Sequence, residues 1–243
     1  MPQLLTHRPS AVAKRTGPKS LLVAWQHPQT RTYLLLGRAT ASADGHFEFE
    51  YFPEVEKNVN FRAIPGFGDS GRTYSSTTLF PFFSTRIMST RRPDRPEWLH
   101  KLHVSEDAQP FEILAHSFGK RVADTYEIFA EPEVDFAAGT MGFSVPVHGL
   151  RYMSAEAKAW VDKSLRRGDT LDVLPEPENP KDSRAQGIWA GGQMLGFVPA
   201  PVLDYLDLMK RPGTFSAEVE RVNPESDGTH LRVVMSLRWT GLG

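Results

Sequence analysis

The first clear pattern along the chain is that of short β-strands. Residues 21–25 (LLVAW) and 33–36 (YLLL) are apolar runs, and residues 46–51 (HFEFEY) alternate aromatic rings with acids. This alternation is typical of a half-buried strand, and turn residues such as Asp44-Gly45 separate the runs. The pattern predicts a three-stranded antiparallel meander.

After this meander the pattern changes to loop, then helix, then strand. Residues 53–76 are rich in Gly, Pro and Asn and predict a loop. Apolar spacing and prolines suited to a first helical turn predict helices over 79–88, 96–102 and 110–115, followed by a strand over 126–129. The region from residue 20 to residue 135 is therefore expected to be an α+β domain, with a small antiparallel sheet plus short helices.

The rest of the chain is dominated by short strands. Residues 136–142 are small and glycine-containing and predict a linker to a second domain, residues 143–243. Strands are predicted over 143–148, 170–174, 186–189, 194–198, 214–222 and 231–239, and helices over 155–165 and 199–208. Many short strands with two helices predict a mainly-β, small and partly open barrel.

Composition and charge narrow the function classes. The 243 residues include no cysteine, which excludes disulfide scaffolds, cysteine-ligated zinc and cysteine nucleophiles. Residues 1–141 hold 16 basic and 16 acidic side chains, and residues 142–243 hold 12 and 13. Because non-specific binding to a polyanion needs accumulated positive charge, any contact with nucleic acid is expected from a few placed residues. With no long apolar stretch and no apolar signal core, we expect a cytoplasmic protein with no membrane partner.

One block of motifs in the second half suggests a family. It runs from Gly149-Leu-Arg-Tyr152 through 175–182 (PEPENPKD) to 195–199 (LGFVP). The Asn-Pro-x-Asp sequence followed by Leu-Gly-x-Val-Pro resembles the HIRAN domain, a small β-barrel found alone in bacteria and fused to remodelling helicases in eukaryotes. The resemblance covers residues 142–243.

This resemblance implies binding of single-stranded DNA with a grip on its free 3′ end. A carboxylate suits the 3′ hydroxyl, Arg or Lys suits a phosphate, and aromatic ring faces suit the bases. Carried over to this sequence, the resemblance implies that Arg151 meets a phosphate and that Tyr152 offers a stacking face. It implies that Asn179 and Asp182 hold the terminal hydroxyl.

Two positions depart from the family pattern. Lys181 stands where DNA-end binders commonly carry an aromatic residue, and residues 199–201 (PAP) stand where the following helix usually offers a basic one. Lys181 supplies a charge and Phe197 a ring nearby, so the groove is either retuned or vestigial. An alternative stays open for the segment from Asn179 to Asp182, in which it is a turn and Asp182 caps its own backbone.

Residues 20–130 resemble the small N-terminal subdomain of HipA-type kinases. The resemblance rests on the meander, on residues 74–83 (YSSTTLFPFF), on a short helical pair, and on residues 110–115 (PFEILA) leading into a strand. In that family the subdomain packs on the kinase core and helps to hold partner proteins, and in split systems a separate short protein restrains the kinase. The kinase's glycine-rich nucleotide loop and metal-binding catalytic loop are missing, so the resemblance implies an interaction platform.

Two basic stretches are candidates for contact with phosphate. Residues 1–19 hold basic but no acidic side chains, and are either a frayed terminus or an arm that touches a phosphate or an acidic partner. A candidate basic patch consists of Arg86, Arg91, Arg92 and Arg95. It is either a solvated face or a phosphate-contacting surface.

The chain contains residue types that occur in catalytic and metal sites, but their arrangement favours neither a catalytic site nor a metal site. His100 and His103 lie three apart on a predicted helix without a third ligand nearby. His116-Ser117 and Asp124 supply the residue types of a hydrolase triad, but the sequence lacks a nucleophile elbow. We therefore predict no catalytic residue, no metal and no cofactor.

Two functions follow from these observations. The first is a non-catalytic binding protein whose HIRAN-like domain recognises DNA as single strands or free 3′ ends, with the N-terminal domain as an interaction platform. The second is a regulatory protein that restrains a HipA-like kinase toxin or a phage-defence system by protein–protein contact.

Overall fold

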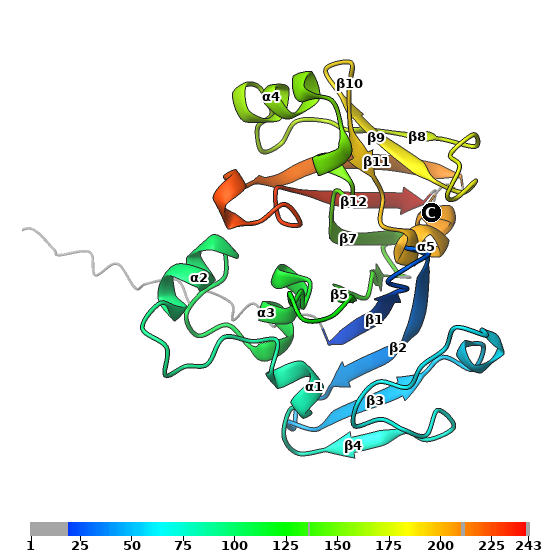
Figure 1. The fold of residues 1–243 in the computed structure, drawn as a ribbon, viewed down its shortest axis with the longest axis vertical. Helices are drawn as coiled ribbons and strands as arrows, with labels where there is room; N and C mark the ends of the chain where they lie inside the picture. Colours follow the sequence, from blue (N-terminus) through cyan, green and yellow to red (C-terminus); the bar gives the residue numbers. More distant parts are fainter. Residues whose placement is uncertain (1–18, 136, 210–211, 242–243) are drawn as a thin grey trace, which may run out of the picture.

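The computed structural model describes residues 19–135, 137–209 and 212–241. Its strands form three antiparallel sheets, and its helices are few and short. Figure 1 shows the sheet of the N-terminal half on one side of the molecule and the two sheets of the C-terminal half on the other. The predicted basic arm, residues 1–19, lies outside the described residues except for Lys19.

The N-terminal sheet has five strands in the order β4-β3-β2-β1-β5. They are β1 (Ser20–Gln26), β2 (Tyr33–Ala41), β3 (Phe47–Tyr51), β4 (Tyr74–Ser76) and β5 (Tyr126–Ala130). The predicted meander is confirmed as β1-β2-β3, with Val23 opposite Gly37 and Ala39 opposite Phe49. Strand β4 comes from the end of the predicted loop, and β5 pairs with the free side of β1.

Three short helices lie beside this sheet. They are α1 (Pro81–Ser84), α2 (Arg95–Lys101) and α3 (Pro110–Ser117), each with a proline in its first turn. The helix predicted over 79–88 is wrong in length, because after Ser84 the backbone continues with tighter bonds, Arg86 N to Phe83 O at 3.0 Å and Ile87 N to Ser84 O at 3.2 Å. In the part of the chain that the structure describes, no helix is long and apolar enough to span a membrane.

The C-terminal half forms the small barrel that the sequence predicts. Its elements are β6 (Glu133–Asp135), β7 (Thr140–Pro146), α4 (Ala155–Lys163), β8 (Asp172–Pro175), β9 (Gln186–Ala190), β10 (Gln193–Phe197), α5 (Leu203–Met209), β11 (Gly213–Val222) and β12 (Val233–Gly241). The sheets β11-β12-β7-β6 and β10-β9-β8 are joined at both sides, by bridges between His148 and Phe197 and between Thr170 and Glu218. The strands therefore close in the circle β7-β10-β9-β8-β11-β12.

The segment predicted as a linker, residues 136–142, belongs in part to this barrel. Residues 140–142 begin β7 and pair with β6 in a hairpin, Asp135 opposite Thr140 and Glu133 opposite Gly142. The Asp135 carboxylate accepts the amides of Ala137 and Ala138 at 2.9 Å each, which stabilises the turn. Residues 137–142 thus belong to a hairpin of the barrel rather than to a linker between domains.

The two halves share a buried apolar layer. Leu21 and Val23 on β1 pack within the N-terminal half, whereas Leu22 and Ala24 pack in one cluster with residues of the barrel. All four residues are fully buried, so β1 is covered on both faces, which explains why it is a continuous apolar run. Figure 1 shows β1 and β5 facing β7 across this layer.

Candidate nucleic-acid interface

Two of the predicted DNA contacts lie on a single turn that follows β7. Gly149 adopts a left-handed φ of 85° and leads into a 3₁₀ turn, Leu150–Tyr152. Leu150 is buried and anchors the turn, while Arg151 and Tyr152 project outward, with Tyr152 71% exposed. The Arg151 guanidinium lies over the Tyr152 ring, 4.6 Å from its centroid. The turn thus presents a cation and an aromatic face together.

A close backbone approach holds this turn against β10. His148 and Phe197 exchange two backbone hydrogen bonds, of 2.9 and 2.8 Å. The approach is possible only because residue 196 is glycine: a Cβ atom there would lie 2.2 Å from the His148 carbonyl oxygen, and its φ is 142°. The half-buried Phe197 ring lies against Gly149. The Gly in the Leu-Gly-x-Val-Pro motif therefore closes the barrel.

The other predicted contacts lie on the loop between β8 and β9. The Asn179 side-chain oxygen accepts the amides of Lys181 at 3.0 Å and Asp182 at 3.3 Å. Asp182 in turn accepts the Arg184 amide at 2.9 Å through one carboxylate oxygen. These bonds form the side-chain-capped turn that the sequence offered as an alternative. Lys181 is exposed at its tip.

Strand pairing brings the loop and the turn to the two sides of Phe197. On one side Phe197 pairs with His148, three residues before Arg151. On the other side it pairs with Gly187, just after the loop. The Arg151 turn and the β8–β9 loop thus adjoin, along the chain, the two pairing partners of Phe197.

Ion pairs fix the loop to α5, and a hydrogen bond connects α5 with the N-terminal half. Arg184 contacts Asp204 at 2.5 Å and Asp207 at 3.0 Å, both on α5. From the same helix, Tyr205 donates to Glu131 at 3.1 Å. The Glu131 carboxylate also receives two hydrogen bonds from Arg38 of β2, at 2.7 and 2.6 Å. The loop is therefore coupled to β2 through a chain of polar contacts.

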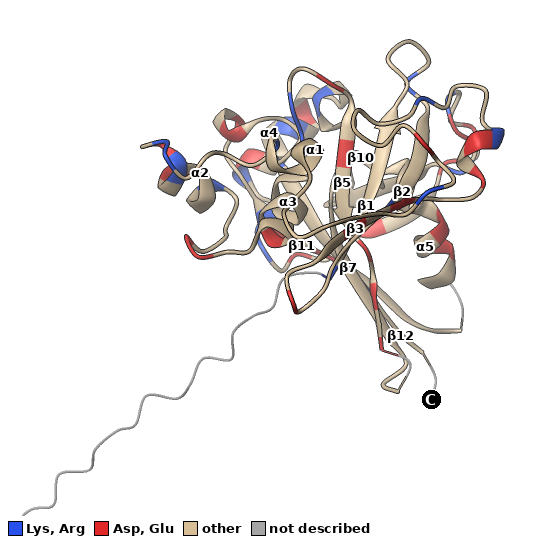
Figure 2. Ribbon diagram, turned by 90° about the horizontal axis from the view of Figure 1, so that it is seen from below, with Lys and Arg blue, Asp and Glu red and all other residues tan. Residues whose placement is uncertain are grey.

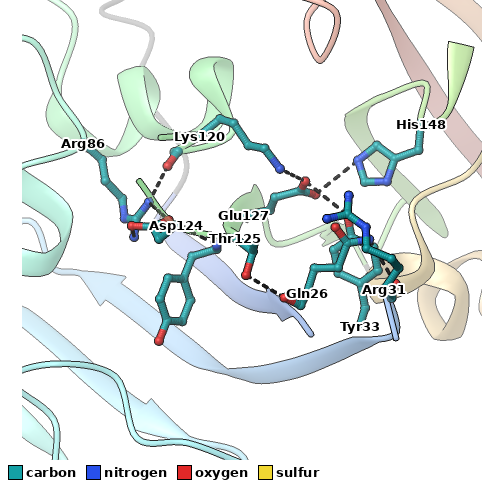
Figure 3. A network of polar contacts seen from close by, with 11 residues as sticks. Gln26, Arg31, Tyr33, Arg86, Lys120, Asp124, Thr125, Glu127 and His148 are labelled. Carbon is teal, nitrogen blue, oxygen red and sulfur yellow. Dashed lines mark hydrogen bonds and ion pairs between the residues drawn. The ribbon is translucent and has the colours of Figure 1, made fainter. Parts of the chain in front are cut away.

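A buried carboxylate couples the Arg151 turn to the N-terminal sheet in the same way. Glu127 on β5 is 4% exposed and receives hydrogen bonds from Tyr33 of β2 at 3.1 Å and from Lys120. Its other oxygen lies 3.1 Å from His148 Nε2 (Figure 3). Burial alone would raise the pKa of Glu127, but the neighbouring His148 and Lys120 lower it to about 2. The carboxylate is ionised at neutral pH and holds His148 in place.

The candidate basic patch is only partly at the surface. Arg86 does not belong to it, because its side chain is buried, binds Asp124 and the Gly119 carbonyl oxygen, and lies over the ring of Phe82. Arg86 lies within the helix predicted over 79–88, and that pattern does not indicate that its side chain pairs with the distant Asp124.

The three remaining arginines of the patch differ in their contacts. Arg92 pairs with Asp94 at 2.6 Å, and Arg95 donates to the Met88 carbonyl oxygen. Arg91 is exposed. Figure 2 shows basic and acidic positions interspersed over both halves, so the charge is local rather than spread as one field.

The residue types of a hydrolase triad are not brought together. His116 Nδ1 contacts the Leu102 carbonyl oxygen at 2.9 Å, the Ser117 hydroxyl is directed to the Leu114 carbonyl oxygen, and Asp124 binds Arg86. Among the described residues, no group of three or more His, Asp or Glu side chains is arranged to hold a metal ion.

Sequence reasoning missed the residues that support the turn and the loop. Glu127 sits within a predicted apolar strand (Tyr126-Glu-Ile-Phe129), and an acid there is a signal that a buried cation must lie opposite. His148 and Arg184 carry no comparable signal, since their partners are distant in the sequence, and Lys120 lies outside the predicted strand that holds its partner Glu127.

Comparison with known proteins adds a family for the barrel. The sequence model of the HIRAN domain matches residues 141–237. The chain contains a HIRAN domain. The match includes the Arg151 turn, the β8–β9 loop and Phe197, and it excludes Tyr33, Lys120 and Glu127.

Two solved structures are similar to part of the chain. A protein from Lactobacillus plantarum is 19% identical, with 43% of this chain and 100% of that chain covered and a TM-score of 0.32. The HIRAN domain of human HLTF is 18% identical, with 42% and 74% covered and a TM-score of 0.27. No curated protein matches the chain. The HipA-like resemblance of residues 20–130 is not confirmed and stays a prediction.

Proposed function

We propose that this chain is a non-catalytic binding protein whose HIRAN domain recognises DNA as single strands or free 3′ ends. In this proposal the N-terminal domain is an interaction platform. The observation that carries the proposal is the exposed Arg151–Tyr152 pair, set beside Phe197 on a turn fixed from both halves.

The chemistry of this turn suits a nucleic-acid strand. Bases of any identity can stack on the exposed Tyr152 ring, and an arginine beside a ring contacts both phosphate and base. Within the described residues, Arg151 forms no ion pair with an acidic side chain, so its charge is open to a phosphate. Phe197 supplies a second, half-buried ring.

The β8–β9 loop supplies polar groups suited to a strand end. Asn179 and Asp182 each use one side-chain oxygen to cap the loop. The Asn179 amide nitrogen and the second Asp182 oxygen form no hydrogen bond with other described residues, and a ribose hydroxyl can donate to a carboxylate. Turn formation and DNA contact are therefore compatible in this loop.

Binding of labelled single-stranded oligonucleotides to the full chain, followed by fluorescence anisotropy at about 50 mM salt, tests the proposal. We expect saturable binding, about tenfold weaker for Arg151→Ala and for Tyr152→Ala. An oligonucleotide with a blocked 3′ end should bind more weakly than one with a free end.

The matched control is Arg91→Ala, which removes an exposed arginine outside the HIRAN domain. Its affinity should equal that of the wild-type chain. Absence of binding at low salt, or equal loss in both arginine variants, would refute recognition by the HIRAN domain.

A further inference from the structure

A cleft separate from the Arg151 turn opens where the barrel meets the α2–α3 region. Its volume is about 420 Å³, a size that suits a small-molecule ligand. It is lined by the end of α4, by the end of β11 and by residues His103 and Arg232. No residue of the proposed DNA contacts lines it.

Arginines are concentrated in the wall of this cleft. Four of them, Arg166, Arg167, Arg221 and Arg232, face two acids, Asp162 and Glu220. The wall thus carries two positive charges in excess, apart from His103.

Both acids already have partners. Asp162 is paired with Arg232, and Glu220 accepts a hydrogen bond from Ser144 and lies 3.6 Å from Arg221 Nε. The excess positive charge therefore lacks a counter-ion among the described residues.

Arg221 keeps a buried, unused donor although Glu220 lies nearby. The residue is 6% exposed, and its Nη1 donates to the Leu102 carbonyl oxygen at 2.6 Å. Its Nε is buried without a hydrogen-bond partner among the described residues, with Glu220 no nearer than 3.6 Å. Burial lowers the pKa of Arg221 and of Arg232. A buried cation with an unused donor is costly unless an anion meets it.

The other two arginines differ in whether their guanidinium groups are available to a ligand. Arg166 uses its guanidinium on the carbonyl oxygens of Leu165 and Lys163, at 2.8 and 2.6 Å, and so caps α4. Arg167 is exposed and forms no ion pair with a described residue. Arg167 and Arg221 are thus the two arginines open to an anion, one at the rim and one at the floor.

We propose that this cleft binds a phosphate group, carried by a small molecule or by the end of a nucleic-acid strand. A phosphate monoester has a charge close to −2 at neutral pH, which balances the excess in the wall. Its oxygens suit several planar guanidinium groups at once, whereas a carboxylate offers only two. Because Leu102 and His103 belong to the N-terminal half, the ligand would connect that half with the barrel.

Isothermal titration calorimetry of the full chain with inorganic phosphate, thymidine 5′-monophosphate and thymidine tests the site. We expect saturable binding of the two phosphates in the millimolar range or tighter, and none of thymidine. Arg167→Ala should weaken binding about tenfold, as the loss of one charged hydrogen bond predicts. Arg221→Met should weaken phosphate binding at least as much. If Arg221→Met does not fold, Arg167→Ala alone decides.

Further measurements identify the source of the phosphate and distinguish this cleft from the Arg151 turn. A single-stranded oligonucleotide with a 5′ phosphate, measured in the Arg151→Ala background against its 5′-hydroxyl counterpart, reports a strand end in the cleft. Arg72→Ala, an exposed arginine near β4 that does not line the cleft, is the matched control. Failure of all phosphate probes, or unchanged affinity in Arg167→Ala, would overturn the proposal.

Discussion

At the scale of single residues, the stability of this molecule depends on charges that are buried together with their partners. Glu127 is the clearest case, because Tyr33, Lys120 and His148 come from three different segments and converge on one carboxylate. Removing one member of such a group leaves the others desolvated and unpaired, which costs more than the group contributes as a whole.

We expect Glu127→Gln to lower the free energy of unfolding at neutral pH by about 3 kcal/mol, because Lys120 loses its buried counter-ion. Urea denaturation measures the loss, and Glu133→Gln, at an exposed position on β6, is the control. The folded-state pKa of about 2 lies below the ordinary value of 4.5. The stabilisation is therefore complete above about pH 4.5 and disappears as pH falls toward 2, where wild type and variant should converge. Equal stability of the two proteins at pH 7 would contradict this account.

At the scale of elements, the barrel depends on how closely the segment after β7 approaches β10. We expect Gly196→Ala to lower the free energy of unfolding by at least about 3 kcal/mol, since its Cβ would meet the His148 carbonyl oxygen and φ is left-handed. Gly142→Ala on β7 is the control, because its Cβ would meet only ordinary contacts of 3.5 Å or more. Thermal unfolding of both variants checks the difference, and similar melting temperatures would show that the approach is not limiting.

Elements with a strong local pattern were predictable, and those that depend on distant partners were not. The strands β1 to β3 and the barrel strands followed from alternation and turn residues. The strands β4 and β6, of three residues each, have no periodicity of their own and exist because β3 and β7 offer an edge. The roles of the candidate site residues stay a prediction, whereas Arg86 was misplaced because its partner Asp124 lies far along the chain.

At the scale of the whole molecule, the shared layer makes the HIRAN domain dependent on the N-terminal sheet. Leu22 and Ala24 of β1 and Phe129 of β5 belong to the same buried cluster as the barrel strands. His148 and the β8–β9 loop are also held by polar contacts that reach the N-terminal half. The apolar run of β1 is consistent with burial on both faces, but it does not identify the barrel as the partner of the second face, because those contacts are distant in the sequence.

We expect a truncated chain, residues 133–243, to lose cooperative unfolding, because it exposes the apolar surface that β1 and β5 cover. Near-ultraviolet circular dichroism and binding of a hydrophobic dye should show a loosely packed barrel, in contrast to the full chain under the same conditions. A sharp unfolding transition at the temperature of the full chain would show that the barrel is independent.

The double coverage of β1 also bears on how the chain folds during its synthesis. β1 leaves the ribosome before its partner strand β5, since Leu21 pairs with Ala130, and the barrel that covers its second face is made later still. Contacts so distant in sequence form slowly. In the interval the run from Leu21 to Ala24 is an uncovered apolar strand, the kind of segment that joins neighbouring chains. The strand that both halves of the folded protein cover is therefore an aggregation hazard while the chain is being made.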